Sequence, residues 1–149
     1  MKRRKAEDGI RVYDSHYRGP CNTERGEHIS CMSWLELHYP ERWPLIFHAA
    51  NETKGTAQHM VMRRRMGVKP GVSDIIDIGG PVGAFELKRQ DRTRSSVSAA
   101  QRDFLTANAL AGGFSAVCYG YECFRLAFID YVSYCDAYLN QTEGNNNGN

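Results

Sequence analysis

Two carboxylates and a lysine stand at a spacing that suits phosphate chemistry. Eleven residues separate Asp74, in GVSDIIDIG, from Glu86, in GAFELKRQ, and the turn-forming segment PVG lies between them. The β-branched and aromatic residues on both sides of this turn predict two strands. Because alternate side chains of a strand share a face, we expect Glu86 and Lys88 to project together.

This arrangement predicts a metal-dependent nuclease. Divalent cations such as Mg²⁺ take oxygen ligands, and a positive charge beside the metal suits a phosphate substrate. Phe85 and Leu87 are expected on the opposite face, as an apolar layer behind the site. The alternative is a solvated strand face with a weak surface ion pair, since Glu-x-Lys is a common tripeptide. Asp74, approached through Gly67 and Gly71, favours the functional interpretation.

Composition predicts one globular domain with a basic surface near these residues. The chain has 149 residues, of which 42% are hydrophobic and 24% charged, and its net charge is only +2, so the overall charge does not indicate a nucleic-acid partner. The distribution of charge is more informative, because basic residues flank the two carboxylates and are expected to contact DNA phosphates. They are Arg63, Arg64, Arg65, Lys69, Arg89, Arg92 and Arg94, with a solvent-facing role as the alternative.

The cysteines and histidines predict neither a disulfide framework nor a zinc ribbon. Five cysteines are present without a Cys-x-x-Cys pair, and the five histidines lack metal-ligand spacing. Cys118 and Cys123 lie in apolar surroundings that predict core positions. We therefore expect a reduced, cytoplasmic compartment. No signal peptide, membrane span or small-molecule cofactor is expected.

The predicted elements alternate between helix and strand. Residues 1–23 are expected to form a polar N-terminal arm, and residues 141–149 a disordered tail. Between them, the predicted order is a helix over 24–38, a strand over 45–49, a helix over 56–66, the two motif strands, a helix over 98–111, a strand over 114–119 and one or two helical segments over 121–139. In the helix over 98–111, the apolar face is predicted to contain Ala100, Phe104, Ala107 and Ala111.

Several ordered motifs together resemble a known family. Glu27 in the first helix, GVKPGVSD, GAFELK and SAAQRDFL are similar to the VRR-NUC branch of the PD-(D/E)xK nuclease superfamily, in particular to small standalone members from phages and bacteria. The resemblance runs from about Glu24 to Val132. It implies an α/β fold in which helices flank a mixed central β-sheet, with a nuclease domain over residues 24–140.

The resemblance also implies a set of metal ligands. Asp74 and Glu86 match the metal-binding carboxylates, Glu27 matches a glutamate that completes the set, and the backbone carbonyl of Leu87 is a further expected ligand. Glu24 competes with Glu27 for this role, and either is also explained as a glutamate that the helix dipole favours. The bound metal is expected to be Mg²⁺, with Mn²⁺ as a substitute.

Two further side chains match catalytic positions of the family. Lys88 matches the catalytic lysine, and Gln101 matches a glutamine on the following helix. The sequence equally allows Gln101 to close a capping box with Ser98. Asn51 resembles an asparagine near the family's active site, or is a turn residue. Two departures are Ser73, where a proline is common, and His28, where a glutamine often follows the glutamate.

The function implied is metal-dependent hydrolysis of DNA phosphodiester bonds. The small members of the family resemble homodimeric Holliday-junction resolvases, so branched or duplex DNA and a second copy of the chain are the expected partners. A generic nicking or restriction-like endonuclease shares the same residues. A catalytically silent DNA-binding module and a cysteine-dependent enzyme are the remaining alternatives.

Overall fold

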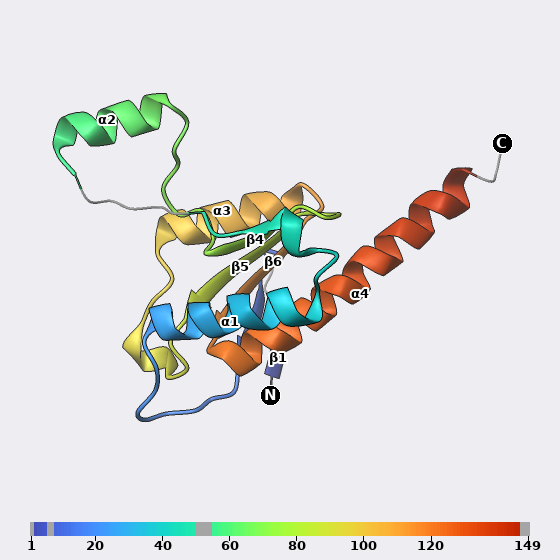
Figure 1. Cartoon of the computed structure of the whole chain (residues 1–149), viewed down its shortest axis with the longest axis horizontal. Coiled ribbons are helices and arrows are strands. Elements are labelled where there is room, and N and C mark those ends of the chain that lie inside the picture. Colours follow the sequence, from blue (N-terminus) through green and yellow to red (C-terminus); the bar gives the residue numbers. More distant parts are fainter. Residues whose placement is uncertain (1, 6–7, 50–54, 147–149) are drawn as a thin grey trace.

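A six-stranded mixed sheet forms the centre of the protein in the computed structural model, which describes residues 2–5, 8–49 and 55–146 (Figure 1). The strand order is β1-β2-β6-β5-β4-β3. Strands β2, β6 and β5 run parallel, while β1, β4 and β3 pair antiparallel with their neighbours. The bounds are β1 Lys2–Lys5, β2 Arg11–Asp14, β3 Ile46–Phe47, β4 Ile75–Asp77, β5 Gly83–Lys88 and β6 Phe114–Tyr119.

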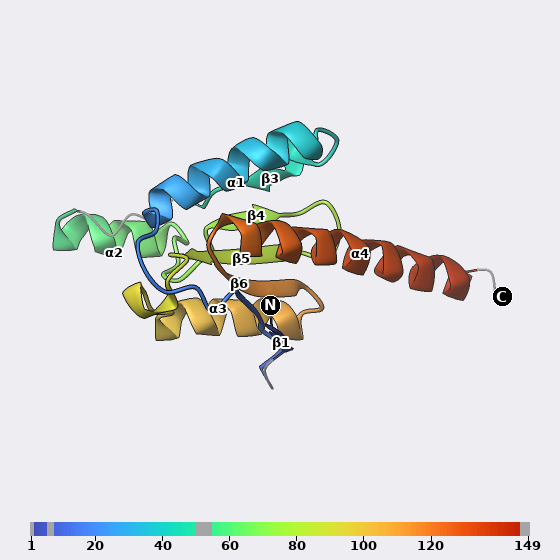
Figure 2. The same cartoon turned by 90° about the horizontal axis from the view of Figure 1, so that it is seen from below.

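Helices cover both faces of this sheet. Helices α1 (Glu24–His38) and α4 (Tyr121–Asn146) pack on one face, and α3 (Ala99–Leu110) packs on the other (Figure 2). Helix α2 (Ala57–Arg65) stands away from the sheet, at the end of the molecule opposite the end of α4. Two short 3₁₀ helices, Trp43–Leu45 and Arg92–Arg94, complete the described elements.

Strand β5 is buried on both faces because it lies inside the sheet between the helical layers. Phe85 and Leu87 join the aromatic core under α1 and α4, where Phe124 and Phe128 surround them. Ala84 faces the smaller apolar cluster under α3. The predicted apolar layer behind Glu86 and Lys88 is therefore confirmed, although the strand is more deeply buried than a solvated face would be.

The predicted α/β fold with a mixed central sheet is confirmed, with one difference in the packing of a helix. In α3, Leu105 is fully buried while Ala107 and Ala111 are exposed, so part of the predicted apolar face is wrong. The larger Leu105 side chain buries more apolar surface than alanine does, and this sets the rotation of the helix. Helix α4 is one continuous helix, which was one of the two predicted possibilities.

The prediction of an N-terminal arm over residues 1–23 is wrong for two stretches. Strands β1 and β2 extend the central sheet, and β2 pairs with β6 in parallel. Burial of Ile10 and Tyr13 supplies the apolar contacts that hold the segment, and the Tyr13 hydroxyl donates to Asp130 Oδ2 at 2.9 Å. The short length of this apolar pattern, set among charged residues, concealed the strand.

The prediction of disorder from residue 141 is also wrong for residues 141–146, which continue α4. Every described residue of α4 after Cys135 is exposed, so no core contact fixes this part. The extension is held by the intrahelical ladder alone and projects away from the sheet (Figure 1).

A buried ion pair ties the start of the 3₁₀ helix Trp43–Leu45 to the sheet. Arg42 donates from Nε to Asp77 Oδ2 at 2.9 Å and from Nη2 to Asp77 Oδ1 at 3.1 Å. The Asp77 side chain has no exposed surface. Both carboxylate oxygens of Asp77 are therefore paired with Arg42.

Replacement of Arg42 by alanine is expected to destabilise the protein by about 3–5 kcal/mol, because it leaves the Asp77 carboxylate buried without its partner. Urea unfolding of Arg42→Ala measures this loss. The control is Arg102→Ala, which breaks the exposed pair with Asp8 and should cost less than about 1 kcal/mol. Equal losses in the two variants would contradict the structural role given to Arg42.

Candidate active site

The centre of the candidate site is a buried carboxylate beside a buried ammonium on β5. Glu86 and Lys88 are 2% and 5% exposed, and Lys88 Nζ lies 3.4 Å from Glu86 Oε1. The two side chains share a face because they are two residues apart on a strand. Since both groups are almost removed from water, a polar interaction between them is stronger than that of a surface pair.

Gln101, at the start of α3, contacts both of these groups. Its Nε2 donates to Glu86 Oε1 at 2.6 Å, and its Oε1 accepts from Lys88 Nζ at 3.2 Å. The same Oε1 accepts the Ser98 backbone N–H, and the Gln101 N–H donates to Ser98 Oγ. The capping box is therefore present, and the two interpretations of Gln101 are compatible.

Gly71 allows the segment before Asp74 to lie against the first turn of α3. Its φ is +77°, which side-chain-bearing residues rarely adopt. A Cβ atom at this position would lie 2.3 Å from the backbone of Ala100 and 2.7 Å from the Gln101 nitrogen. Glycine at this position therefore lets the segment that leads to Asp74 lie against the start of α3, which carries Gln101.

Asp74 precedes β4 and is held against the end of β5. Its Oδ2 accepts the Leu87 N–H at 2.8 Å. Because the N–H and C=O of a strand residue lie on the same edge, the Leu87 carbonyl is on the Asp74 side of β5. The structure therefore brings together Asp74, Glu86, Lys88, Gln101 and the Leu87 backbone, as the sequence predicted.

Electrostatics set Glu86 apart from the other carboxylates. Burial, followed by the negative charge of Asp74, raises the Glu86 pKa from 4.5 to about 8, although Lys88 lowers it in part. Glu86 Oε2 is buried and accepts no hydrogen bond from the described residues. A buried oxygen with no donor is costly, so a cation at this oxygen would satisfy it.

Two histidines lie beside Asp74. One ligand atom from each of His28, His48 and Asp74 falls within 4.8 Å of the others, and the two imidazole rings meet edge-on with centroids 4.4 Å apart. Burial lowers the pKa of His28, as does the neighbouring His48. The sequence gave no metal-ligand spacing for them, because His28 is on α1 and His48 follows β3.

Glu27 is turned away from this group. Its Oε2 accepts the Tyr121 N–H, the first amide of α4, at 2.6 Å. It lines a separate cavity of about 390 Å³ with Asn22, Ser30 and Gln90 among others. The hydrogen bond from Tyr121 occupies Glu27 Oε2, and the place of Glu27 in the metal set stays a prediction. Successive helical residues point about 100° apart, and the neighbouring His28 faces Asp74 instead. Glu24, its competitor, is exposed.

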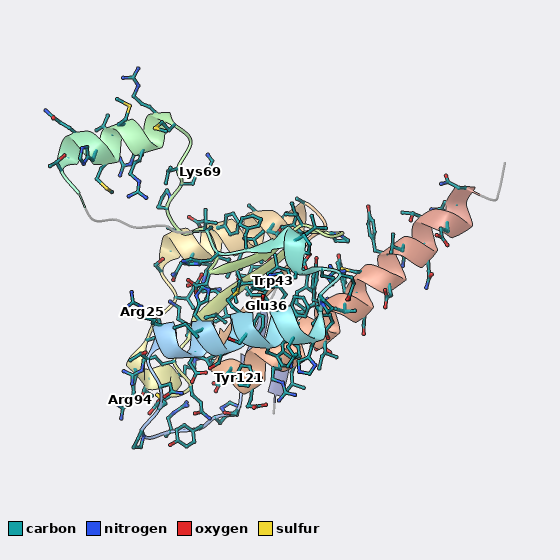
Figure 3. The ribbon with its side chains drawn as sticks, in the orientation of Figure 1. Arg25, Glu36, Trp43, Lys69, Arg94 and Tyr121 are labelled. Atoms are coloured by element: carbon teal, nitrogen blue, oxygen red, sulfur yellow. The ribbon has the colours of Figure 1, made fainter. Side chains whose placement is uncertain are left out.

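The predicted DNA-contacting residues divide into two groups. Arg89 donates to the carbonyls of Cys21 and Asn22, Arg92 pairs with Asp14, and Arg94 pairs with Asp91. These contacts give Arg89, Arg92 and Arg94 partners within the protein itself. Arg63, Arg64 and Arg65 lie in the last turns of α2, followed by the exposed Lys69. Figure 3 shows Lys69 on the connection that leads from α2 back to the sheet. Arg94 lies at the lower left of the same view, away from α2.

Cys118 and Cys123 are core residues, as predicted, and Cys21 is only partly buried. All five are free thiols, and Cys118 and Cys123 are at most 1% exposed. Burial raises the pKa of Cys123 to about 11 and that of Cys118 well above its usual value. Thiols of this kind are poor nucleophiles, which argues against a cysteine-dependent enzyme.

Within the described residues, no helix combines the length and apolar character that crossing a membrane requires.

Comparison with solved structures identifies the fold. A protein described as "VRR_NUC domain protein" superimposes with a TM-score of 0.63 and 20% sequence identity, over 77% of this chain and 92% of that chain. The chain has a VRR-NUC fold. No family model matches the sequence, and no curated protein matches it.

The VRR-NUC fold places the predicted motifs in one site without assigning their chemistry. Asp74, Glu86, Lys88 and Gln101 meet at the end of β5, whereas Asn51 lies outside the described residues. Sequence reasoning missed His28 and His48. The signal in the sequence was that His28, directly after Glu27, stands where the resembled family often has a glutamine, and it concerned His28 alone.

Replacement of Glu86 by glutamine is expected to change how stability depends on pH. The folded-state pKa of about 8 lies above the unfolded value of 4.5, so the native state binds the extra proton between these values and wild type loses stability as pH rises. Above pH 8 the loss levels off. In a chelator, the unfolding free energy should fall from pH 5 to pH 9 by on the order of 3 kcal/mol more in wild type than in Glu86→Gln.

The matched control is Glu36→Gln, which changes an exposed glutamate of α1 and should retain the wild-type pH dependence. Urea unfolding at both pH values provides the measurement. If Glu86→Gln and wild type lost the same free energy, the Glu86 proton would not be linked to folding.

Proposed function

We propose that this protein is a metal-dependent endonuclease that hydrolyses phosphodiester bonds in DNA. The observation that carries the proposal is the buried Glu86–Lys88 pair, bridged by Gln101 and bordered by Asp74. A buried ammonium next to two carboxylates suits a polyanionic substrate that arrives with a divalent cation. The similarity in fold to a VRR-NUC domain protein supports the same conclusion.

The donor set fits a hard divalent cation. Asp74 and Glu86 offer carboxylate oxygens, and Leu87 offers a carbonyl on the same edge of β5. The orphaned Glu86 Oε2 gives this fit an independent basis, since it lacks the donor that a buried oxygen requires. Mg²⁺ suits these ligands, and Mn²⁺ suits them equally well. Glu27 is left out of the set because it binds the α4 amide.

The residues of the chain divide the remaining work. When bound, the cation neutralises the scissile phosphate and lowers the pKa of water. Lys88 holds a positive charge where negative charge develops on the phosphate, and its burial makes this interaction stronger than it would be in water. Gln101 positions both Lys88 and Glu86 through its two amide atoms. Asp74 is oriented by the Leu87 N–H.

The substrate proposed is branched DNA, with a four-way junction as the specific candidate and a homodimer as the acting species. This rests on the resemblance to small standalone VRR-NUC nucleases. A generic nicking or restriction-like endonuclease would use the same residues and differ only in the DNA that it cuts. A catalytically silent DNA-binding module is disfavoured because the expected catalytic side chains are all present. Glu86, Lys88 and Gln101 contact one another, and Asp74 lies beside Glu86.

Replacement of Lys88 by methionine is expected to reduce cleavage by about 100-fold or more, because the apolar stem stays packed while the ammonium is lost. Cleavage is measured on a four-way junction, a splayed fork and a linear duplex, with Mg²⁺, Mn²⁺ or EDTA. Symmetric cuts confined to the four-way junction would establish a resolvase. Cutting of all three substrates would favour the generic endonuclease.

The control is Lys88→Arg, which keeps the charge but replaces a compact ammonium by a planar group and should restore little activity. Thermal unfolding of each variant confirms that the fold persists. Absence of metal-dependent cleavage by folded wild type on every substrate would reject the nuclease proposal.

Simultaneous replacement of Arg63, Arg64 and Arg65 by glutamine is expected to weaken DNA binding at low salt. If these α2 residues contact phosphates, the slope of log affinity against log salt should fall by about one for each lost contact. Fluorescence anisotropy with a catalytically inactive background measures the slope. Arg125→Gln, which removes a cation paired with Glu122 on α4, is the control, and an unchanged slope in the triple variant would exclude α2 from the DNA interface.

A further inference from the structure

From the cluster of His28, His48 and Asp74, we infer a second cation position, selective for borderline transition metals such as Co²⁺ or Zn²⁺, that shares Asp74 with the proposed nuclease centre. One ligand atom from each residue lies within 4.8 Å of the other two. The three come from α1, from the segment after β3 and from the segment before β4. Their convergence depends on tertiary packing, unlike that of neighbours on one helix.

The hydrogen bond of His48 prepares it as a ligand. His48 Nδ1 lies 2.6 Å from the main-chain oxygen of Asp74. A carbonyl oxygen only accepts hydrogen bonds, so Nδ1 carries the proton and Nε2 carries the free lone pair. Metal-binding histidines are commonly oriented in this way, with the other ring nitrogen donating to a carbonyl or carboxylate.

The surroundings of His28 also favour a neutral ligand. Its ring is half-buried and meets the His48 ring edge-on, with centroids 4.4 Å apart. Two protonated imidazoles this close would repel each other, whereas two neutral ones can share a cation. The Asp74 carboxylate adds one negative charge, so the set is two nitrogens and one oxygen.

This ligand chemistry separates the position from the carboxylate set around Glu86. Imidazole suits Zn²⁺, Co²⁺ and Ni²⁺, whereas Mg²⁺ prefers oxygen alone. Three protein ligands leave a coordination position open, as in catalytic zinc sites. The inference deepens the proposed function because the shared Asp74 would join the two positions, but the histidine site is defined by its own residues.

Titration of the purified, chelator-treated protein with Co²⁺ provides the test, because the visible absorption of Co²⁺ reports nitrogen ligation and coordination directly. Wild type is compared with His28→Gln, His48→Gln and the double variant. The control is His59→Gln, which changes an exposed histidine on α2. We expect Co²⁺ affinity to fall by at least about tenfold in each single variant and to stay unchanged in the control.

Excess Mg²⁺ should displace little Co²⁺ from wild type. Co²⁺ spectra and affinities that are the same in wild type and the folded double variant would overturn the inference, as would complete displacement by Mg²⁺. Mg²⁺-dependent DNA cleavage is measured on the same preparations. Histidine-dependent Co²⁺ binding without cleavage by wild type would reject the proposed nuclease and leave the metal position intact.

Discussion

The burial of the Glu86 carboxylate is the constraint on which the site depends. Ionising a carboxyl at the centre of a sheet is costly, and two groups that contact Glu86 offset that cost: Lys88 on the same strand and Gln101 on α3. Each has a second role, since Gln101 also caps α3 and Lys88 also donates to Gln101. The site and the local fold are therefore stabilised by the same hydrogen bonds.

Local rules predicted the elements that carry the site. Strand alternation placed Glu86 and Lys88 on one face, and the Ser98-x-x-Gln101 spacing predicted the capping box that the structure contains. The sequence did not decide between capping and site contact for Gln101. Its amide has a nitrogen and an oxygen, and the oxygen accepts more than one hydrogen bond, so both roles are satisfied at once.

The errors arose where partners are distant in the chain. The resemblance placed Glu27 in the metal set, whereas the sequence gave no sign that its Oε2 accepts a hydrogen bond from an amide 94 residues later. His28 and His48 gave no spacing signal because their proximity comes from the packing of α1 near the sheet edge. Strand β2 was missed for a similar reason, since Tyr13 is buried only once β6 lies beside it.

Helix α2 lies in the chain between two residues that the body holds in place, His48 and Gly71. His48 is bonded to the Asp74 carbonyl, and Gly71 is fitted against the first turn of α3. Because both of these residues are fixed by the body, the closure entropy of the connection that carries α2 changes only slowly with its length. A change in the length or charge of this connection would therefore alter the surface around α2 without moving the carboxylates of Asp74 and Glu86.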